Sequence, residues 1–434
     1  MNPVKVGIAG LGTVGSGTVN ILRRNADEIA RRVGRPIEIA HIGARRDNPA
    51  CDISGIRVSR DVMEVARDPQ IDIVVELIGG TTTARELVLT AIANGKHVVT
   101  ANKALIAEHG NEIFSAAHAK GVDIAFEAAV AGGVPILKAL GEGLAANRIK
   151  WVAGIINGTG NFILTEMRDK GRDFADVLKE AQALGYAEAD PTFDVEGIDA
   201  AHKLTILASI AFGIPLQFSR VYTEGISRLT REDIAAAEQF GYRIKHLGIA
   251  KDTGNGIELR VHPTLIPQSV LLASVNGVMN AVMVDGDAVG PTLFYGAGAG
   301  AGPTGSAVVA DIIEMGRSLT LDHDLRVPYL GFHTDVLSDH PVLPIDDVVC
   351  PFYIRLHVQD RTGVLADITR ILSQHNISIE AMFQKDVDDN QPVPIMLMTH
   401  SVLERDMNAA LAEIAGLDAV LDDIVRIRVE LLKA

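Results

Sequence analysis

The first residues of the chain carry a glycine pattern that restricts the fold more than any other feature. Val4–Ala9 reads as a short buried strand, and after it a helical pattern runs to about Ala30. Between them lies a G-x-G-x-x-G, placed between strand and helix as a dinucleotide-binding turn requires. Such glycines allow a tight turn, close approach of the backbone to a pyrophosphate and close helix–strand packing. The residues expected to bind a dinucleotide here are Gly10, Leu11, Gly12, Thr13, Val14 and Gly15.

Composition and charge narrow the class of protein. The chain has 434 residues, which favours roughly three domains. Hydrophobic residues make up 47% and aromatic residues 4%, as suits an aliphatic α/β core. The net charge of −15 argues against nucleic acid or an anionic membrane as a partner.

The sequence also lacks the usual signs of export or membrane insertion. The first strand begins at Val4 and leaves no room for a signal peptide, and the apolar stretch 204–216 is too short to span a bilayer. Cys51 and Cys350 lie far apart in sequence and do not indicate a disulfide scaffold or a thiolate metal site. We therefore expect a cytoplasmic protein with no membrane and no nucleic-acid partner.

Alternating strands and helices predict an N-terminal Rossmann domain over residues 1–150. Its further strands are expected at 37–43, 71–77, 97–100 and 123–126, with helices such as 81–93 and 110–120 between them. This alternation is typical of a parallel sheet with helices on both faces, so the fold class is α/β.

A central α+β domain is expected over residues 151–325. Its predicted strands are 151–156, 257–264, 271–274, 280–284 and 291–295, and its predicted helices are 160–169, 174–184 and 199–212. A further helix at 307–318 is expected to pack back on the first domain. Prolines and weak periodicity predict a linker at 326–350.

The remaining residues, 351–434, predict a compact C-terminal domain. Strands are expected at 352–358, 377–385, 393–400 and 424–430, helices at 363–375 and 404–415, and a polar turn at 386–391. The resulting order, βαββαβ, is the ferredoxin-like arrangement.

Two arginines follow the second predicted strand, in Ala44-Arg45-Arg46-Asp47. An NAD site usually offers an acid there for the ribose 2′-hydroxyl, whereas arginine suits a 2′-phosphate. Arg45 therefore favours NADP(H), and Asp47 leaves NAD(H) as an alternative. That both arginines are solvated surface charges is the third interpretation.

Four more candidate residues lie at the ends of the strands predicted at 71–77 and 97–100, where a doubly wound sheet faces its ligand crevice. They are Gly80, Thr81, Thr100 and Lys103. Lys103 could bind a carboxylate or assist proton transfer, and an ordinary surface lysine is the alternative.

The strongest group of reactive side chains follows residue 184. Gly185-Tyr186-Ala187-Glu188-Ala189-Asp190-Pro191 precedes Asp199 and Lys203, which are four residues apart on one helix face. An acid beside a lysine in a cleft can orient water or hold a substrate amine, and the lysine can protonate a developing alkoxide. A salt bridge on the helix surface is the alternative.

The stretch Glu127-Ala128-Ala129-Val130-Ala131-Gly132-Gly133-Val134-Pro135 follows a predicted strand. Its carbonyl oxygens and Glu127 could hold a hard monovalent cation. A plain turn is equally consistent with the residues.

Taken together, these stretches resemble homoserine dehydrogenase, in the long bacterial form with a C-terminal ACT domain, along essentially the whole chain. The most specific matches are Asn157-Gly158-Thr159, residues 184–191, and Gly197-Ile198-Asp199-Ala200-Ala201-His202-Lys203. The glycine turn, Thr100-Ala101-Asn102-Lys103 and the Gly/Ala stretch 296–302 agree in order and spacing.

The resemblance implies reversible reduction of L-aspartate 4-semialdehyde to L-homoserine, with the central domain serving catalysis and dimerisation. Lys203 is then the proton donor, Glu188 and Asp199 contact the substrate, and Lys103 lies at the junction of cofactor and substrate. Sodium would bind Glu127, Val130, Gly132 and Val134, and Gly300 would contact the cofactor.

The C-terminal unit resembles an ACT domain at Asp360-Arg361-Thr362-Gly363-Val364-Leu365. Such domains pair and bind a small amino acid near this turn. The resemblance therefore implies a homodimer or homotetramer with threonine as effector. The expected effector contacts are Asp360, Gly363, Val364 and Leu365.

Two other functions would account for part of this pattern. Aspartate-semialdehyde dehydrogenase needs a cysteine nucleophile, and neither Cys51 in the first domain nor Cys350 in the linker suits that role. An amino-acid-sensing ACT protein with a vestigial dehydrogenase domain is the alternative of another class. The intact glycine turn and the Asp199–Lys203 pair argue against it.

Overall fold

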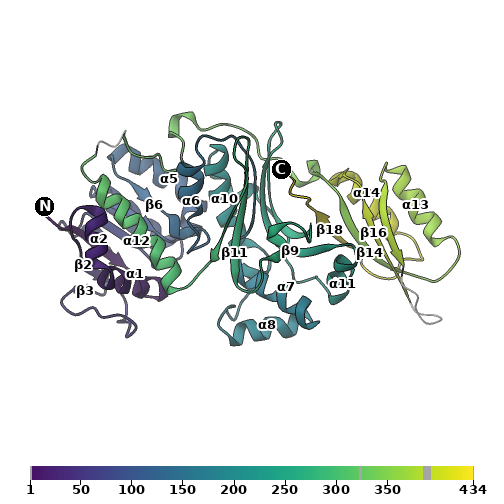
Figure 1. The fold of residues 1–434 in the computed structure, drawn as a ribbon, viewed down its shortest axis with the longest axis horizontal. Helices are drawn as coiled ribbons and strands as arrows, with labels where there is room; N and C mark the ends of the chain where they lie inside the picture. The colour runs from purple at the N-terminus through teal and green to yellow at the C-terminus, as the bar shows by residue number, and fades with distance from the viewer. Residues whose placement is uncertain (1, 322–324, 385–391, 434) are drawn as a thin grey trace.

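The computed structural model describes residues 2–321, 325–384 and 392–433, in three regions along one long axis (Figure 1). The N-terminal domain lies at one end, a mixed sheet with its helices in the middle, and the C-terminal domain at the other end. The polar turn expected at 386–391 lies outside the described residues. None of the helices in the described ranges is long and apolar enough to cross a membrane.

The N-terminal sheet is parallel, with strand order β3-β2-β1-β4-β5-β6. Its strands are β1 Val4–Ala9, β2 Ile37–Gly43, β3 Arg57–Ser59, β4 Ile73–Glu76, β5 His97–Thr100 and β6 Ile124–Ala125. Its helices are α1 Thr13–Arg24, α2 Ala26–Val33, α3 Met63–Arg67, α4 Thr82–Ala93 and α5 Lys103–Lys120. This is the Rossmann order, in which ligands bind where the strand order reverses, here between β1 and β4. The predicted fold class is confirmed.

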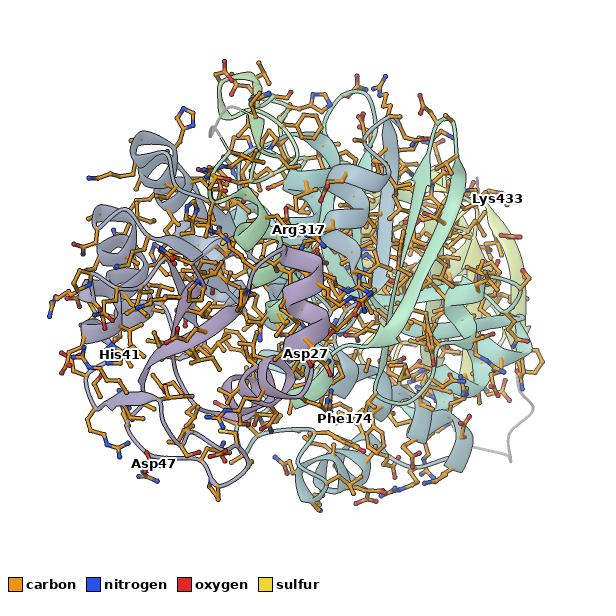
Figure 2. The ribbon with its side chains drawn as sticks, turned by 60° about the vertical axis from the view of Figure 1, so that its left-hand side comes forward. Asp27, His41, Asp47, Phe174, Arg317 and Lys433 are labelled. Carbon is orange, nitrogen blue, oxygen red and sulfur yellow. The ribbon has the colours of Figure 1, made fainter. Side chains whose placement is uncertain are left out.

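A late helix, α12 (Ala301–Ser318), returns to the Rossmann domain and packs on α1, as expected. The two helices approach closely because Gly17 has no side chain: a Cβ there would lie 2.0 Å from the carbonyl oxygen of Ala301. Figure 2 shows Arg317 at the C-terminal end of α12 beside α2, where its Nε donates to the carbonyl of Arg32 at 2.8 Å.

The central domain is built on a mixed sheet with strand order β12-β11-β7-β9-β10. These strands are β7 Ile149–Ile155, β9 Tyr242–Asp252, β10 Ile257–Pro267, β11 Met279–Gly286 and β12 Gly290–Ala297, and the two-residue β8 (Tyr222–Thr223) pairs with β10. The helices are α6 Ile136–Lys138, α7 Gly158–Lys170, α8 Phe174–Ala183, α9 Thr192–Val195, α10 Ile198–Phe212 and α11 Arg231–Gln239.

Two sequence expectations for this domain fail. The strand predicted at residues 271–274 is wrong, because Leu271–Ser274 closes a single 3-10 turn between Pro267 and Gly277. The long strand β9 was not predicted. Its mid-section is buried on both faces, so its polar residues Lys245 and His246 do not alternate with apolar ones as a half-exposed strand would require.

The C-terminal domain confirms the predicted βαββαβ order. Its elements are β14 Phe352–Val358, α13 Val364–Gln374, β15 Ile379–Gln384, β16 Val393–Thr399, α14 Glu404–Ala415 and β18 Val425–Val429, with a short pair β13 (Val349–Cys350) and β17 (Val402–Leu403). Within it the strand order is β18-β14-β16-β15.

The central and C-terminal sheets are one continuous sheet. β18 pairs with β14 on one side and with β10 on the other, through Thr264↔Arg428 and Leu265↔Val429. A single apolar cluster spans the junction and includes Leu265, Tyr353 and Ile427. The C-terminal domain therefore shares both backbone pairing and core with the central domain.

Residues 326–350, predicted as a linker, follow the surface of the other domains. Tyr329 stacks on Phe114 and donates its hydroxyl to the carbonyl of Val122, at 2.8 Å, on the Rossmann domain. Val342 then forms a bridge with Ile257 at the start of β10. The segment is thus held by contacts along its length.

Candidate functional site

Asp199 and Lys203, on the first turns of α10, meet Lys103 from the start of α5. One carboxylate oxygen of Asp199 lies 2.6 Å from the Lys203 Nζ, and the other lies 3.0 Å from the Lys103 Nζ. Lys203 also donates to the carbonyl of Ile156, at the end of β7, at 2.7 Å. The three predicted residues are therefore brought together from two domains, and the burial of Asp199 and Lys203 excludes a lone surface salt bridge.

The charges in this cluster change one another's proton affinity. Burial alone would raise the pKa of the Asp199 carboxyl, but the ammonium groups of Lys203 and Lys103 hold it well below its usual range. Burial lowers the pKa of Lys203, and the positive charge of Lys103 adds to this against the attraction of Asp199. Lys203 is thus an ammonium that releases its proton more readily than an ordinary lysine.

Lys103 behaves in the opposite way. Its pKa is raised, chiefly by Asp199 and further by Asp194 and Glu188. Its side chain is 38% exposed, compared with 12% for Lys203. Lys103 is therefore a permanent, accessible positive charge at the edge of the cluster, which suits binding of an anionic group better than proton transfer.

Two further residues, Asn157 and Asp194, belong to this cluster. Asn157 caps α7 by accepting from Gly160 N at 2.7 Å, and its Nδ2 donates to Asp194 at 2.7 Å and Asp199 at 2.9 Å. Burial raises the pKa of Asp194. The available signal was position, because Asn157 directly follows a strand and begins a helix, where Asn caps are common.

The segment carrying Glu188 lies beside this cluster without contacting Lys203. Glu188 is exposed, and its backbone carbonyl accepts from Gln182 at 3.0 Å. Phe193, on α9, stacks against His202 with ring centres 5.6 Å apart. His202 is buried and its Nε2 lies 3.1 Å from the Glu108 carboxylate, so it is a packed side chain with its own partner.

The glycine turn is shaped for an anion. Gly10 has a φ of 103°, which favours glycine. A Cβ on Gly15 would lie 2.2 Å from the Gly10 carbonyl oxygen, so Gly15 must lack a side chain. No atom lies within 4 Å of where a Cβ on Gly12 would be. The first turn of α1 carries neither a side-chain cap nor an acidic residue. Its free N–H groups, from Thr13 and Val14 onward, therefore fit a pyrophosphate.

A second group of residues borders the same crevice at the ends of β4 and β5. Glu76 is fully buried, and its carboxylate accepts from the hydroxyl of Thr100 at 2.6 Å. The Nδ2 of Asn102 donates to the carbonyl of Gly80 at 2.7 Å, and Asn102 caps α5, which begins with Lys103. Thr81 is the N-cap residue of α4. These predicted positions lie together at the carboxyl edge of the sheet.

The loop after β2 presents three charged side chains. Arg45 and Asp47 are both exposed, and Figure 2 shows Asp47 at the periphery of the Rossmann domain. Arg60, at the end of the neighbouring β3, donates to the Asp47 carboxylate at 2.9 Å and to the carbonyl of Ala44. The acid that could serve a ribose hydroxyl therefore already has a cationic partner.

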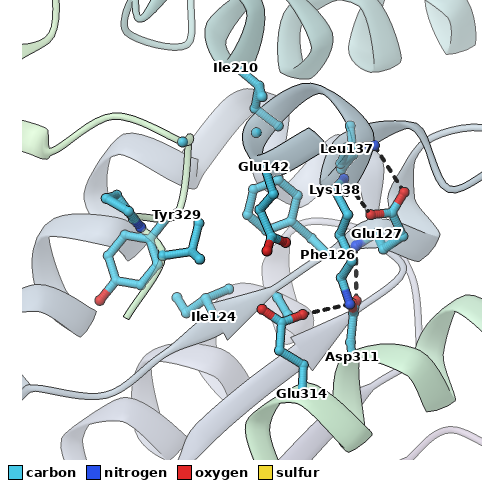
Figure 3. Close-up of a pocket in the computed structure, with 15 residues that line it drawn as sticks. Ile124, Phe126, Glu127, Leu137, Lys138, Glu142, Ile210, Asp311, Glu314 and Tyr329 are labelled. Carbon is cyan, nitrogen blue, oxygen red and sulfur yellow. Dashed lines mark hydrogen bonds and ion pairs between the residues drawn. The ribbon is translucent and has the colours of Figure 1, made fainter. Parts of the chain in front are cut away.

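Glu127 lies in a buried cluster of acids between the domains (Figure 3). Both of its carboxylate oxygens accept backbone N–H groups at the start of α6, from Leu137 at 2.9 Å and Lys138 at 2.8 Å. Burial and the nearby charge of Asp311 raise the pKa of Glu127 to about 7. The Lys138 Nζ pairs with Asp311 at 2.9 Å and Glu314 at 2.6 Å.

The rest of the predicted cation loop offers backbone oxygens. No backbone hydrogen bond within the described ranges reaches the carbonyls of Val130 or Gly132, whereas that of Val134 accepts from Ile136 N at 2.8 Å. Gly132 lies against the 296–302 stretch, since a Cβ there would be 2.6 Å from the Gly298 carbonyl. Free carbonyls fit a hard cation, but the Glu127 carboxylate is turned to α6 instead.

Gly300 and Gly363 are both N-cap residues of helices. Gly300, with a φ of 121°, is the N-cap of α12, and Gly363, with a φ of 97°, is the N-cap of α13. Neither helix start has a side-chain cap. Asp360 is exposed beside the α13 turn, whereas Val364 is buried and Leu365 partly buried in the domain core.

Three family models match successive parts of the chain. Residues 10–127 match "Homoserine dehydrogenase, NAD binding domain", residues 135–313 match "Homoserine dehydrogenase", and residues 352–419 match "ACT domain". A homoserine dehydrogenase of Pseudomonas aeruginosa is 64% identical over 433 residues, covering 100% of both chains.

Solved structures give the same result. The crystal structure of a homoserine dehydrogenase from Thiobacillus denitrificans matches with a TM-score of 0.96 and 62% identity, covering 100% of this chain and 99% of that one. A hyperthermophilic archaeal homoserine dehydrogenase in complex with NADPH matches with a TM-score of 0.60 and 26% identity, over 72% of this chain and 97% of that one.

Proposed function

The chain belongs to the homoserine dehydrogenase family, and we propose how its residues divide the reversible reduction of L-aspartate 4-semialdehyde to L-homoserine. A nicotinamide cofactor supplies or accepts the hydride when bound. The chain itself must position the aldehyde, stabilise negative charge on its oxygen and deliver a proton.

Lys203 delivers that proton. The observation that carries this assignment is the buried contact between Lys203 and Asp199. Burial lowers the pKa of the Lys203 ammonium, and the Asp199 carboxylate, 2.6 Å away, opposes that shift and fixes the position of the Nζ. In the forward direction the Lys203 Nζ protonates the substrate alkoxide, and in reverse the neutral amine accepts the hydroxyl proton. Asp199 fixes the lysine and balances its charge.

The substrate's own charges are held at the edge of this cluster. Lys103, with its raised pKa and its exposure, is proposed to bind the substrate carboxylate next to the nicotinamide. Glu188 is proposed to bind the substrate ammonium group. Asn157 holds Asp199 from the other side, and its Nδ2 also donates to Asp194.

We propose NADP(H) as the preferred cofactor, with NAD(H) still accepted. The cofactor residues are those of the glycine turn together with Gly80, Thr81, Thr100, Lys103 and Gly300. Arg45 is proposed to contact the 2′-phosphate, because Arg60 neutralises Asp47, the acid that would otherwise favour NAD(H). The archaeal relative that binds NADPH supports this choice.

A sodium ion is proposed at Glu127, Val130, Gly132 and Val134, bound through backbone carbonyls. The two carbonyls without a backbone partner support this site. There the ion would tie the first domain to the 296–302 stretch, and its role would be structural.

Regulation is assigned to the C-terminal domain. Threonine is proposed to bind at Asp360, Gly363, Val364 and Leu365, where the uncapped start of α13 suits a carboxylate. A homodimer or homotetramer would let that binding favour one arrangement of the assembly. A cytoplasmic location stays a prediction.

The test is direct. With homoserine and NADP, absorbance at 340 nm should rise as NADPH forms. With aspartate semialdehyde and NADPH, it should fall as NADPH is oxidised. A folded chain that binds threonine but shows no turnover in either direction would instead support the alternative, an amino-acid sensor with a vestigial dehydrogenase domain. The family match and the intact Lys203 cluster do not favour that alternative.

A further inference from the structure

A short stretch of the central domain lies between the C-terminal domain and the start of α10. We call residues 222–227, which begin with β8, the bridging segment. It pairs with β10 at its first two residues. Each of its two sides is bonded to a different part of the molecule.

On one side, Arg428 of β18 holds the bridging segment. Its Nη1 donates to the Glu224 carboxylate at 2.8 Å and its Nη2 to the Tyr222 hydroxyl at 3.2 Å. Its Nε donates to Glu404, at the start of α14, at 2.7 Å. One fully buried guanidinium therefore bonds both to the bridging segment and to the C-terminal domain. Only arginine has a planar group with donors placed for this.

On the other side, the bridging segment is bonded to the joint between α9 and α10. Ile226 N donates to the Val195 carbonyl at 2.9 Å, and the Ser227 hydroxyl donates to Glu196 at 2.7 Å. The next residue, Gly197, is the left-handed N-cap of α10, with a φ of 84°. Asp199 follows two residues later.

A buried histidine reinforces the same contact. His246 Nε2 lies 3.0 Å from the Glu224 carbonyl, and its ring would lie 3.2 Å from a Cβ on Gly197. The backbone of Glu224 and the N-cap of α10 therefore pack against one ring.

The bridging segment is open toward solvent. A cavity of about 1,770 Å³ lies between the two domains, with Tyr222, Glu224 and Ser227 on one wall and Asn408 and Asp422 on the other. Because this side lacks close packing, the segment is held by its pairing with β10, by Arg428 and by the bonds to the α9–α10 joint.

We propose that the bridging segment positions the α9–α10 joint, and with it Asp194 and Asp199, according to where Arg428 holds Glu224. Glu224 and Arg428 are thus positioning residues for the proton-transfer group, although neither contacts the substrate. This inference rests on the proposed roles of Asp199 and Lys203. It gives the C-terminal domain a route to turnover that does not pass through the cofactor site.

The test compares two matched substitutions, Arg428→Lys and Arg355→Lys. Both arginines are buried on strands of the C-terminal domain and bond to a central-domain carboxylate. Arg355 lines the same cavity, but it pairs with Asp233 of α11 and not with the bridging segment. Arg428→Lys should lower kcat about tenfold, as a small misplacement of reacting groups does, with NADPH affinity unchanged. Arg355→Lys should keep kcat close to the wild-type value at a similar loss of thermal stability.

A second variant approaches the segment from its other end. Ser227→Ala removes the bond to Glu196 without touching the C-terminal domain, and it should lower kcat in the same direction as Arg428→Lys. Equal losses of kcat in the two arginine variants, or normal kcat in both Arg428→Lys and Ser227→Ala, would overturn the proposal.

Amide hydrogen exchange separates this proposal from the proposed function. In Arg428→Lys, and not in Arg355→Lys, exchange should rise over residues 194–200. That result does not depend on turnover, so a chain without homoserine dehydrogenase activity could still show it. Unchanged exchange over these residues would refute the positioning role, whatever the activity.

Discussion

Lys203 is the residue whose removal should cost the reaction most. Replacing it with alanine removes the buried ammonium beside Asp199 and should lower kcat by roughly 10²–10⁴-fold, the usual contribution of a positioned general acid. NADPH affinity, measured by fluorescence titration, should change little. Lys179→Ala is the control, because its side chain is 77% exposed. Near wild-type turnover in Lys203→Ala would assign the proton to another group.

Arg45 should determine part of the cofactor preference. Arg45→Ala removes the charge that is proposed to contact the 2′-phosphate and should weaken NADPH more than NADH, because only NADPH carries that group. Arg46→Ala, at the adjacent exposed position, is the matched control. Dissociation constants for both cofactors provide the measurement, and equal losses for NADPH and NADH would contradict the assignment.

Lys245 should make stability depend on pH. It is buried on β9, with its Nζ 2.6 Å from the Val275 carbonyl. Burial and the charges of Arg168 and Arg243 lower its pKa to about 7, against the opposing charge of Asp169. Between pH 7 and 10 the unfolded chain therefore binds more protons than the folded one, so folding stability rises with pH.

Lys245→Met removes that titration. Relative to the variant, the wild-type chain should gain up to about 1.4 kcal/mol per pH unit above pH 7. Denaturant unfolding at pH 7, 8.5 and 10 measures the difference. Parallel stability profiles for the two proteins would show that Lys245 keeps an ordinary pKa.

At the scale of elements, prediction succeeded where a local pattern decides the structure. The bounds of β1, β2, β5, β14 and α14 agree with those predicted, because their apolar residues and turn signals are local. β9 was missed because it is an interior strand between β7 and β10 whose two faces are both covered, by helices such as α10 and α11 on one side and by the turn at Leu271–Ser274 on the other, and this burial removes the alternation. The Lys103–Asp199 contact also needed the fold, since α5 and α10 lie far apart in the sequence.

The close contact between α1 and α12 depends on Gly17, which Gly305 faces from α12. Gly17→Ala would place a Cβ 2.0 Å from the backbone of Ala301, so the helices must separate, at a cost of about 1–3 kcal/mol. Gly302→Ala, on the opposite helix, meets no atom within 4 Å and should be neutral or slightly stabilising. Thermal unfolding of both variants tests this. Equal effects would mean that helix propensity, rather than close packing, governs the contact.

For the whole molecule, the shared sheet makes the C-terminal domain more than an appended regulator. Lys103, Asp199 and Lys203 all precede it in the sequence, so it supplies none of the groups proposed for chemistry. Yet β18 covers part of the edge of β10, and Leu265 of that strand is buried among C-terminal side chains. A ligand that moves this domain must also strain the central sheet, which gives regulation a physical basis.

The central and C-terminal domains should therefore unfold together. Calorimetry of the full chain should show them in one transition, because separating them exposes the shared apolar cluster and breaks the buried Arg428–Glu224 and Arg355–Asp233 pairs. A chain ending at Val349 should lose any response to threonine. It should also unfold at a lower temperature and aggregate more readily, because the edge of β10 is then exposed. Separate transitions for the central and C-terminal domains, or an unchanged melting temperature of the central domain after truncation, would show that these two domains are independent and that β18 only rests against β10.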